Sequence, residues 1–131
     1  MEQAIATPPV RVFLADDSGE IRRRVADILV ANKIDVIGYA ETPDDCISGI
    51  LGTNPDVVVL DVQLEGGSGL QVLKAVKEKA PEVAFVVFSN NSGPAYRKRY
   101  LGEGANRFLD KSTEFGQLAQ AVVAAGGRAV H

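Results

Sequence analysis

The sequence has little of several features that would mark a secreted, membrane-bound or nucleic-acid-binding protein. Its 131 residues include a single cysteine, Cys46, which excludes an internal disulfide bond and is typical of a reducing compartment. No apolar run approaches the roughly 18 residues of a membrane span, and the N-terminus lacks the basic-then-apolar pattern of a signal peptide. The net charge of −3 gives no general attraction to DNA or to anionic lipid. We therefore expect a cytoplasmic chain that neither enters a membrane nor binds DNA directly.

The composition that remains is that of one ordinary globular domain. The chain is 46% apolar and 24% charged, which is enough apolar material for one sizeable core. We expect a flexible leader at residues 1–9, one folded domain over residues 10–126 and a short tail at 127–131. Cys46 lies beside Ile47 in an apolar stretch, so a small buried side chain explains it better than a reactive thiol.

Apolar runs and helical periods alternate along the chain five times. The runs predict strands at residues 10–15, 34–40, 57–60, 83–89 and 106–111, each followed by a helix. Ser18 is a candidate N-cap, Thr42 with Asp45 resembles a capping box, and Ser112 or Thr113 is expected to cap the last helix. Connections this short require right-handed crossovers and parallel strands. The pattern therefore predicts an α/β fold, a flavodoxin-like doubly wound (βα)5 domain with a five-stranded parallel sheet in the order 2-1-3-4-5.

The predicted helices differ in how much apolar surface they offer. The last helix is expected to bury four residues, namely Phe115, Leu118, Ala119 and Val122. The fourth, at about 94–103, has only Tyr96, Tyr100 and Leu101 as apolar anchors. Its basic segment 97–100 could form a binding patch, although a solvated helix face explains it more simply.

Charged and polar residues gather at one end of the predicted strands. Asp16 and Asp17 follow the first strand, Asp61 follows the third, Ser89 ends the fourth and Lys111 ends the fifth. The carboxyl ends of parallel strands share one edge, where ligands bind in such sheets. Each residue alone has an ordinary explanation as a turn, a cap or a surface charge. Together they predict one site.

Three carboxylates at one edge repel each other unless they are protonated or bind a hard cation. Mg²⁺ prefers oxygen ligands and keeps several waters, so one or two carboxylates are enough to hold it. Beside such a cation, a carboxylate such as Asp61 can attack a phosphoryl group and form an aspartyl-phosphate. Lys111 would then supply positive charge and Ser89 a hydrogen-bond donor for the phosphoryl oxygens.

The sequence resembles the receiver domain of bacterial two-component response regulators, as found in stand-alone chemotaxis regulators, over residues 10–125. The resemblance rests on the acidic pair, Asp61 after an apolar strand, Ser89, and Phe108 three residues before Lys111. It implies that Asp61 is the phosphoacceptor, Lys111 the phosphoryl partner, Ser89 the switch hydroxyl and Phe108 the switch aromatic. It also implies a Mg²⁺ site made by Asp17 and Asp61 directly, by Asp16 through water and by the backbone carbonyl of Gln63.

The resemblance further implies a signalling role without an enzymatic activity beyond self-catalysed phosphorylation and dephosphorylation. The phosphoryl donor would be a sensor histidine kinase or a histidine phosphotransfer protein. Phosphorylation would draw Ser89 inward and let Phe108 rotate from a more exposed position. The surface of the fourth helix, fifth strand and fifth helix would then change for a downstream protein partner.

Three residues depart from the pattern of the family. Ser112 follows Lys111 where proline is common, often in a cis bond, so we expect a trans bond here. Glu65 stands where the loop after the phosphoacceptor usually has proline, and Asn90 where a small residue is usual. Gln63 and Asn91 occupy positions that tune dephosphorylation in the family.

Three other classes of protein share parts of this pattern. A haloacid-dehalogenase-like phosphatase needs a second aspartate two residues after the nucleophile, where this chain has Gln63. In a flavodoxin, Asp16 and Asp17 would repel the flavin phosphate, and no tryptophan is present to flank the ring. A receiver-like module that binds partners without phosphorylation stays open, because Asn90 and Ser112 could belong to a degenerate site.

Overall fold

A five-stranded parallel sheet forms the centre of the protein. The computed structural model describes residues 8–127, so residues 1–7 of the expected leader and 128–131 of the expected tail lie outside the described part. The strands of the sheet are β1 (Arg11–Ala15), β2 (Asp35–Ala40), β3 (Val57–Leu60), β6 (Ala84–Ser89) and β7 (Arg107–Asp110). Their order is β2-β1-β3-β6-β7, and all neighbours pair in parallel. The predicted order, 2-1-3-4-5 counted along these five strands, is confirmed.

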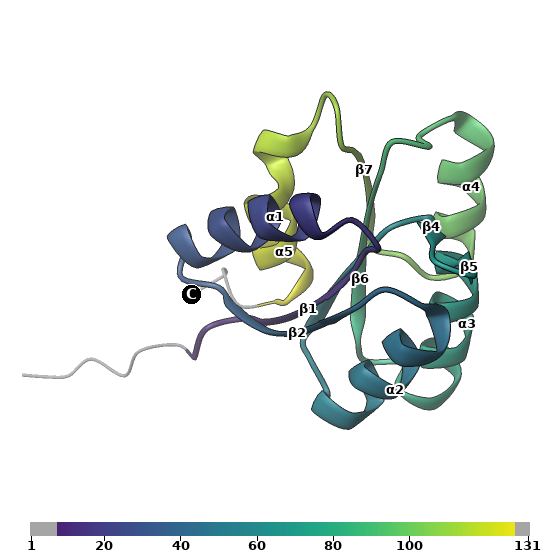
Figure 1. The fold of residues 1–131 in the computed structure, drawn as a ribbon, viewed down its shortest axis with the longest axis horizontal. Helices are drawn as coiled ribbons and strands as arrows, with labels where there is room; N and C mark the ends of the chain where they lie inside the picture. The colour runs from purple at the N-terminus through teal and green to yellow at the C-terminus, as the bar shows by residue number, and fades with distance from the viewer. Residues whose placement is uncertain (1–7, 128–131) are drawn as a thin grey trace, which may run out of the picture.

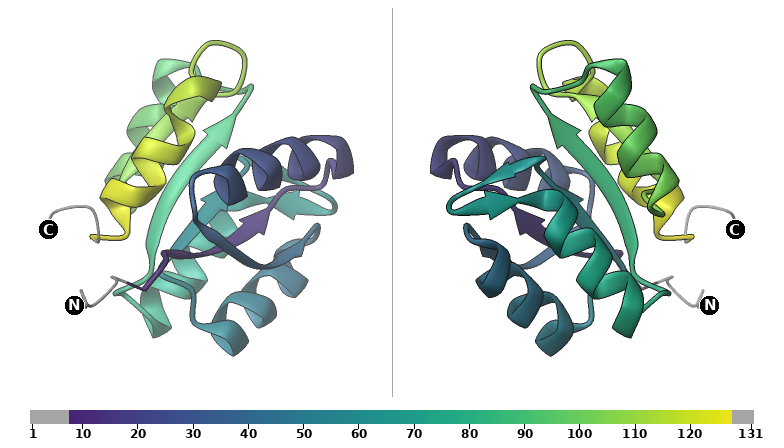
Figure 2. Two further views of the ribbon diagram at one scale, coloured as in Figure 1. Left: turned by 90° about the vertical axis from the view of Figure 1, so that its left-hand side faces the viewer. Right: turned by 90° about the vertical axis from the view of Figure 1, so that its right-hand side faces the viewer.

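Helices cover both faces of this sheet. They are α1 (Gly19–Ala31), α2 (Pro43–Thr53), α3 (Gly69–Lys79), α4 (Pro94–Gly102) and α5 (Leu118–Ala125). Figure 1 shows α1 and α5 on one face, and α2, α3 and α4 on the other. In Figure 2, α5 lies in front of α4 from one side and behind it from the other, with the last strands between them. The chain is therefore doubly wound, as the sequence predicted.

The central strands are apolar throughout because both of their faces are buried. All four residues of β3 are buried, and so are all six of β6. Successive side chains of a strand point to opposite faces, so Phe85 and Val87 join the core under α2, α3 and α4, whereas Val86 and Phe88 join the core under α1 and α5. The sheet thus separates two cores that the same strands supply.

Local hydrogen bonds at the helix ends agree with several predicted caps. The Ser18 hydroxyl accepts a hydrogen bond from the Ile21 N–H, and the Thr42 hydroxyl accepts one from the Asp45 N–H. At the other end of α2, Asn54 adopts a left-handed conformation with φ 51°. A short polar side chain tolerates this conformation better than a bulky one, so the helix ends there.

The structure differs from the sequence analysis in two local features, one of them not predicted and the other predicted wrongly. The segment before α3 contains a short antiparallel hairpin, β4 (Gln63–Leu64) with β5 (Gly67–Ser68), which was not predicted. Neither Ser112 nor Thr113 caps the last helix: both precede the N-cap positions, and the Ser112 hydroxyl and the N–H groups of both residues donate to the Asp110 carboxylate. A 3-10 turn (Phe115–Gln117) with Glu114 at its N-cap precedes α5.

The expected weakness of the fourth helix is confirmed, and its anchoring is weaker than predicted. Only Tyr100 of α4 is buried, whereas Tyr96 and Leu101 are each 45% exposed. By contrast, Cys46 of α2 is fully buried, and this burial raises the pKa of its thiol to about 12. The interpretation of Cys46 as a core residue fits the structure.

No helix within residues 8–127 is both long enough and apolar enough to cross a membrane.

Candidate functional site

The predicted acidic residues meet at the carboxyl end of the sheet. Asp16 and Asp17 follow β1, and Asp61 follows its neighbour β3, so the register of the two strands brings them together. One carboxylate oxygen from each of the three lies within 4.8 Å of the others. Asp16 and Asp61 are buried, whereas Asp17 is exposed. The cluster therefore has one open side, which is where a ligand could enter.

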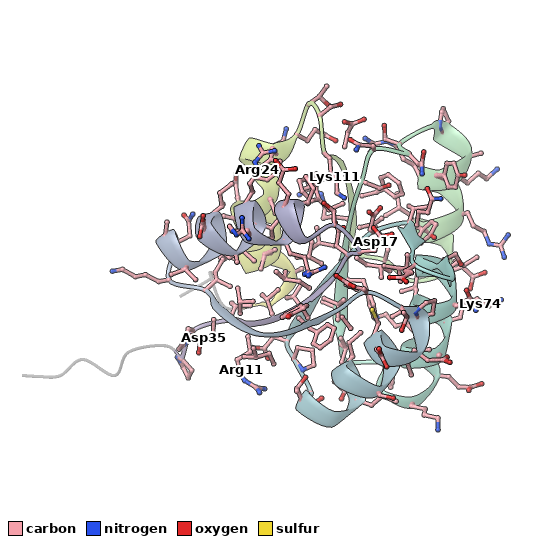
Figure 3. All side chains as sticks on the ribbon, in the orientation of Figure 1. Arg11, Asp17, Arg24, Asp35, Lys74 and Lys111 are labelled. Carbon is pink, nitrogen blue, oxygen red and sulfur yellow. The ribbon has the colours of Figure 1, made fainter. Side chains whose placement is uncertain are left out.

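Lys111 lies between the two buried carboxylates. Its Nζ is 2.7 Å from Asp16 Oδ2 and 2.9 Å from Asp61 Oδ2, and the residue is only 8% exposed. An unpaired ammonium would be costly at this depth, and so would two adjacent unpaired carboxylates. The three groups compensate one another, and their positions agree with the predicted convergence of these residues at one edge of the sheet. Figure 3 shows Lys111 and Asp17 at the same end of the molecule.

Burial and pairing act in opposite directions on the pKa values in this cluster. Burial lowers the pKa of Lys111, but its hydrogen bonds to Asp16 and Asp61 outweigh burial and raise it. Burial also raises the pKa of Asp16, and the hydrogen bond from Lys111 only partly offsets this. The contact with Lys111 is the largest of the interactions that favour the ionised form of Asp16.

A small hollow opens beside the cluster. Its volume is about 230 Å³, and it is lined by Asp17, Asp61, Gln63, Ser89, Asn90 and Asn91. Ser89 ends β6 and is buried, and its Oγ accepts a hydrogen bond from the Asn91 N–H at 3.0 Å. The Gln63 N–H lies 3.4 Å from Asp61 Oδ1. The hollow has room for a phosphoryl-sized group between a carboxylate and a hydroxyl.

Gly69 allows the chain to pass close to Asp61. A Cβ atom at this position would come within 2.1 Å of the Asp61 carbonyl oxygen, so no other residue fits without moving the backbone. The Gly69 N–H also donates to the Val62 carbonyl at 2.7 Å. The start of α3 is thereby fixed against the loop that carries Asp61.

Phe108 is already buried in this structure. It is 3% exposed, its ring packs edge-on against Tyr100 with 6.0 Å between centroids, and the Arg97 guanidinium lies 5.2 Å from the ring centroid. The expectation of a more exposed starting position is therefore not met here.

Arg22 supports the acidic loop and was not singled out in the sequence. Its Nη1 donates to the Asp16 carbonyl at 2.7 Å and to Glu41 Oε2 at 2.8 Å, and its guanidinium stacks over the Tyr39 ring. Arg22 lies near the start of α1. It reaches Asp16 because the loop between β1 and α1 carries that residue. Glu41 comes from the loop after β2, and no spacing in the sequence indicates that contact.

These observations define a member of the response regulator receiver family. The family described as "Response regulator receiver domain" matches residues 12–123, which is most of the chain. The chain belongs to this family, and it is a response regulator receiver domain of two-component systems.

Individual relatives carry the same domain within longer proteins. The chain is 35% identical over 105 residues to a protein-glutamate methylesterase/protein-glutamine glutaminase of Clostridium acetobutylicum, covering 78% of this chain and 30% of that protein. It is 29% identical over 114 residues to the DNA-binding transcriptional activator DevR/DosR of Mycobacterium tuberculosis, covering 86% of this chain and 52% of that protein. The matched region thus spans 30% of the first relative and 52% of the second.

Solved structures agree with the sequence relatives. The response regulator domain of Thermotoga maritima CheB superposes with a TM-score of 0.81 at 26% identity, covering 91% of this chain and 97% of that domain.

The departures from the family's usual pattern lie around the site. No cis peptide bond occurs in residues 8–127, so the expected trans bond between Lys111 and Ser112 is confirmed. Asn90 lines the hollow beside Asp61, and Glu65 lies exposed between β4 and β5.

Proposed function

We propose that this domain accepts a phosphoryl group on Asp61 with the help of Mg²⁺ and passes the signal on through a change of its surface. The observation that carries the proposal is the Lys111 ammonium shared by Asp16 and Asp61, beside a hollow that also holds the Ser89 side chain. A buried carboxylate that faces such a hollow is positioned as a nucleophile. Ser89 and Lys111 would hydrogen-bond the phosphoryl oxygens, and Phe108 would respond as the switch aromatic.

The donor set fits Mg²⁺. Three carboxylates with oxygens within 4.8 Å of one another, one of them exposed, suit a hard cation that keeps several waters. Asp17 and Asp61 would bind the ion directly, Asp16 through water, and the backbone carbonyl of Gln63 would complete the protein's share. The ion would neutralise charge on the phosphoryl oxygens and on the attacking carboxylate.

The covalent step would transfer a phosphoryl group from a nitrogen or oxygen atom of the donor to a carboxylate oxygen of Asp61. An Asp61 carboxylate oxygen would form a bond to phosphorus while the donor's P–N bond, in a phosphohistidine, or P–O bond, in an acyl phosphate, breaks. The bonding electrons leave with the imidazole, which takes up a proton, or with the released carboxylate. Lys111 would keep its proton throughout and stabilise the phosphoryl oxygens by its charge and its hydrogen bonds.

The response would reach the surface formed by α4, β7 and α5. In the described state, the Ser89 hydroxyl accepts a hydrogen bond from Asn91. A phosphoryl oxygen would draw the hydroxyl toward Asp61 as a donor and change the loop that leads into α4. A downstream protein would recognise the changed surface. The upstream partner would be a sensor histidine kinase or a histidine phosphotransfer protein.

We assign this function to residues 10–126, acting in the cytoplasm, with no enzymatic activity beyond the domain's own phosphorylation and dephosphorylation. The methyl-ester hydrolysis and DNA binding named for the two relatives are not assigned to this domain. The rival is a domain of the same fold that binds its partner without phosphorylation. Asn90 supports that rival because its side chain adds bulk at the hollow.

Intact mass spectrometry separates the two functions. The wild-type chain and Asp61→Asn are incubated with a small acyl phosphate, with and without Mg²⁺. One phosphoryl adduct that requires both Asp61 and Mg²⁺ supports the proposal. An adduct that persists in Asp61→Asn assigns the acceptor elsewhere, and no adduct with either an acyl phosphate or a phosphorylated histidine kinase supports the phosphorylation-independent module.

A further inference from the structure

The Asp110 carboxylate, at the end of β7, gathers donors from two different loops. Its Oδ1 accepts hydrogen bonds from the Ser112 N–H at 2.7 Å, from the Ser112 hydroxyl and from the Thr113 N–H at 3.2 Å. Its Oδ2 accepts one from the Ser92 hydroxyl. These bonds hold the pKa of Asp110 far below its usual range, chiefly through the Ser112 and Ser92 hydroxyls. The carboxylate therefore stays charged and serves as a multiple acceptor.

The two loops joined by Asp110 carry Lys111 and part of the lining of the hollow. Ser92 belongs to the loop that follows Ser89 and includes Asn90 and Asn91, which line the hollow. Ser112 directly follows Lys111. Ser89 and Asp110 are register partners at the ends of β6 and β7, and the Lys111 N–H donates to the Ser89 carbonyl at 3.1 Å. The side chain of Asp110 thus adds a second connection just beyond the last backbone hydrogen bond between these strands.

A second group of contacts holds the same corner from the outside. Glu114 Oε1 accepts hydrogen bonds from the Asp110 N–H at 2.8 Å and from Arg97 Nη2 at 3.0 Å. Arg97 also donates to the Phe108 carbonyl at 2.9 Å. None of the residues from Ser112 to Gln117 is a buried apolar residue. Polar contacts on both sides therefore hold the end of β7 and the loop after it.

We propose that Asp110 is a positioning residue for Lys111: by tying the loop after β6 to the loop after β7, its carboxylate sets where the Lys111 ammonium lies relative to Asp61 and Ser89. This inference rests on the proposed phosphorylation of Asp61. Asp110 touches neither the acceptor carboxylate nor the phosphoryl group, and it acts through Lys111 alone. A lysine held by a flexible loop would reach the same carboxylates in many orientations, whereas a fixed loop keeps one.

The experiment measures the rate constant for phosphorylation of Asp61 at saturating acyl phosphate and Mg²⁺. The variants are Asp110→Ala and Asp110→Asn, with Asp35→Ala as the matched control. Asp35→Ala removes the same charge at an exposed position at the start of β2, far from Lys111 in Figure 3. We expect Asp110→Ala to lower the rate constant about tenfold, because misplaced catalytic groups lose rate steeply with distance. Asp110→Asn keeps an acceptor oxygen and should recover part of the loss, and Asp35→Ala should match the wild type.

A double-mutant cycle with Lys111→Ala distinguishes positioning from general structural support. If Asp110 acts through Lys111, then Asp110→Ala has no further effect on the rate constant once Lys111 is absent. If Asp110 only stabilises the fold, the two losses multiply. Should Asp110→Ala fail to fold, Ser92→Ala removes a single donor of the same connection and is expected to give a smaller loss that also vanishes in the Lys111→Ala background.

The outcomes separate this inference from the proposed function. If the wild type itself takes no phosphoryl group on Asp61, the proposed function fails. If the wild type is phosphorylated and either Asp110→Ala keeps its rate constant or the two losses multiply, the positioning role of Asp110 is overturned and the proposed function stands.

Discussion

Helices α3 and α4 lie next to each other on one face of the sheet but are held in place by different forces (Figure 1). α3 buries Gly69, Val72, Leu73 and Val76. α4 buries only Tyr100, and Arg97 supplies polar contacts to the Ser92 and Phe108 carbonyls and to Glu114. Apolar burial fixes α3, and its loss would open the core. Polar contacts can be exchanged for others at low cost, so α4 can shift while the core remains intact.

This difference suits the two helices to different roles. α3 starts beside Asp61, where the backbones pass so close that position 69 has no room for a Cβ atom. α4 starts after the loop that follows Ser89, and its contacts lead to Phe108 and to the end of β7. A groove of about 490 Å³ separates α4 from the β5–α3 segment, with Leu70, Tyr96 and Tyr100 among its lining residues. A change at the site can therefore be absorbed at α4 without a cost in the packing of α3.

The same substitution in the two helices should give the largest contrast. We expect Leu73→Ala in α3 to lower the free energy of unfolding by about 2–5 kcal/mol, because Leu73 is fully buried and a cavity would remain. Leu101→Ala in α4 should change it by less than about 0.5 kcal/mol, because Leu101 is 45% exposed. Urea denaturation measures both. Equal losses would show that α4 is anchored as firmly as α3.

Phosphorylation should change the amide hydrogen exchange of α4 more than that of α3. We expect amide hydrogen exchange in α4 to change about tenfold when Asp61 is phosphorylated or bound to a phosphoryl analogue, a typical size for coupling between two sites. Exchange in α3 should stay the same. Asp61→Asn under the same conditions is the control. A change confined to α3, or spread evenly over both helices, would contradict the assignment of α4 as the responsive element.

Removing the polar contacts of α4 should have a moderate effect. Arg97→Ala deletes its hydrogen bonds to the Ser92 and Phe108 carbonyls and its ion pair with Glu114. We expect a loss of about 1 kcal/mol, because Arg97 is partly exposed and such contacts have modest net value. The exposed neighbour Lys98 provides the matched control, Lys98→Ala. Calorimetry and hydrogen exchange in α4 test this, and a fully stable α4 without Arg97 would refute it.

The smallest effect at neutral pH is expected from Tyr100→Phe. The Tyr100 hydroxyl donates to the Val62 carbonyl at a long 3.4 Å, so its loss should cost about 0.5 kcal/mol or less. At high pH we expect the order of stability to reverse, so that Tyr100→Phe becomes more stable than the wild type. Burial raises the pKa of Tyr100 from 10.0 to about 12, so the folded protein holds this proton more tightly than the unfolded chain does.

The pH dependence follows from that difference. The contribution of the neutral Tyr100 is complete below pH 10 and is lost as the pH rises to about 12. The wild type should therefore lose more stability than Tyr100→Phe over this interval. Cys46 is present in both proteins, so its own raised pKa cancels in the comparison. Parallel stability curves for the two proteins would show that Tyr100 titrates normally in the folded state.

The sequence was sufficient to predict the sheet and the place of the acidic cluster. Apolar runs mark the strands, and short connections imply that they are parallel. The sequence alone therefore assigns one edge of the sheet to the polar residues Asp16, Asp17, Asp61, Ser89 and Lys111. Each of these residues lies at or just after the carboxyl end of a strand, and the carboxyl ends of parallel strands lie at one edge of the sheet. The fold and the site were therefore predictable from the same pattern.

The contacts that fix the loops around the site could not be predicted in this way. Ser112 and Thr113 have the residue types of helix caps, yet they lie before the 3-10 turn that precedes α5, and their N–H groups donate to the Asp110 carboxylate. The Arg97–Glu114 pair joins residues that are neighbours only after β7 has paired with β6. The β4–β5 hairpin has two residues per strand, too few for any periodicity.

The most direct test of the account is to locate the phosphoryl group itself. Borohydride reduces an acyl phosphate to an alcohol and converts a phosphorylated aspartate into homoserine, which peptide mass mapping can place in the sequence. After incubation with an acyl phosphate and Mg²⁺, the account predicts homoserine at position 61 and at no other aspartate. Homoserine at Asp16 or Asp17, or a phosphoryl group that resists reduction because it sits on another kind of residue, would contradict it.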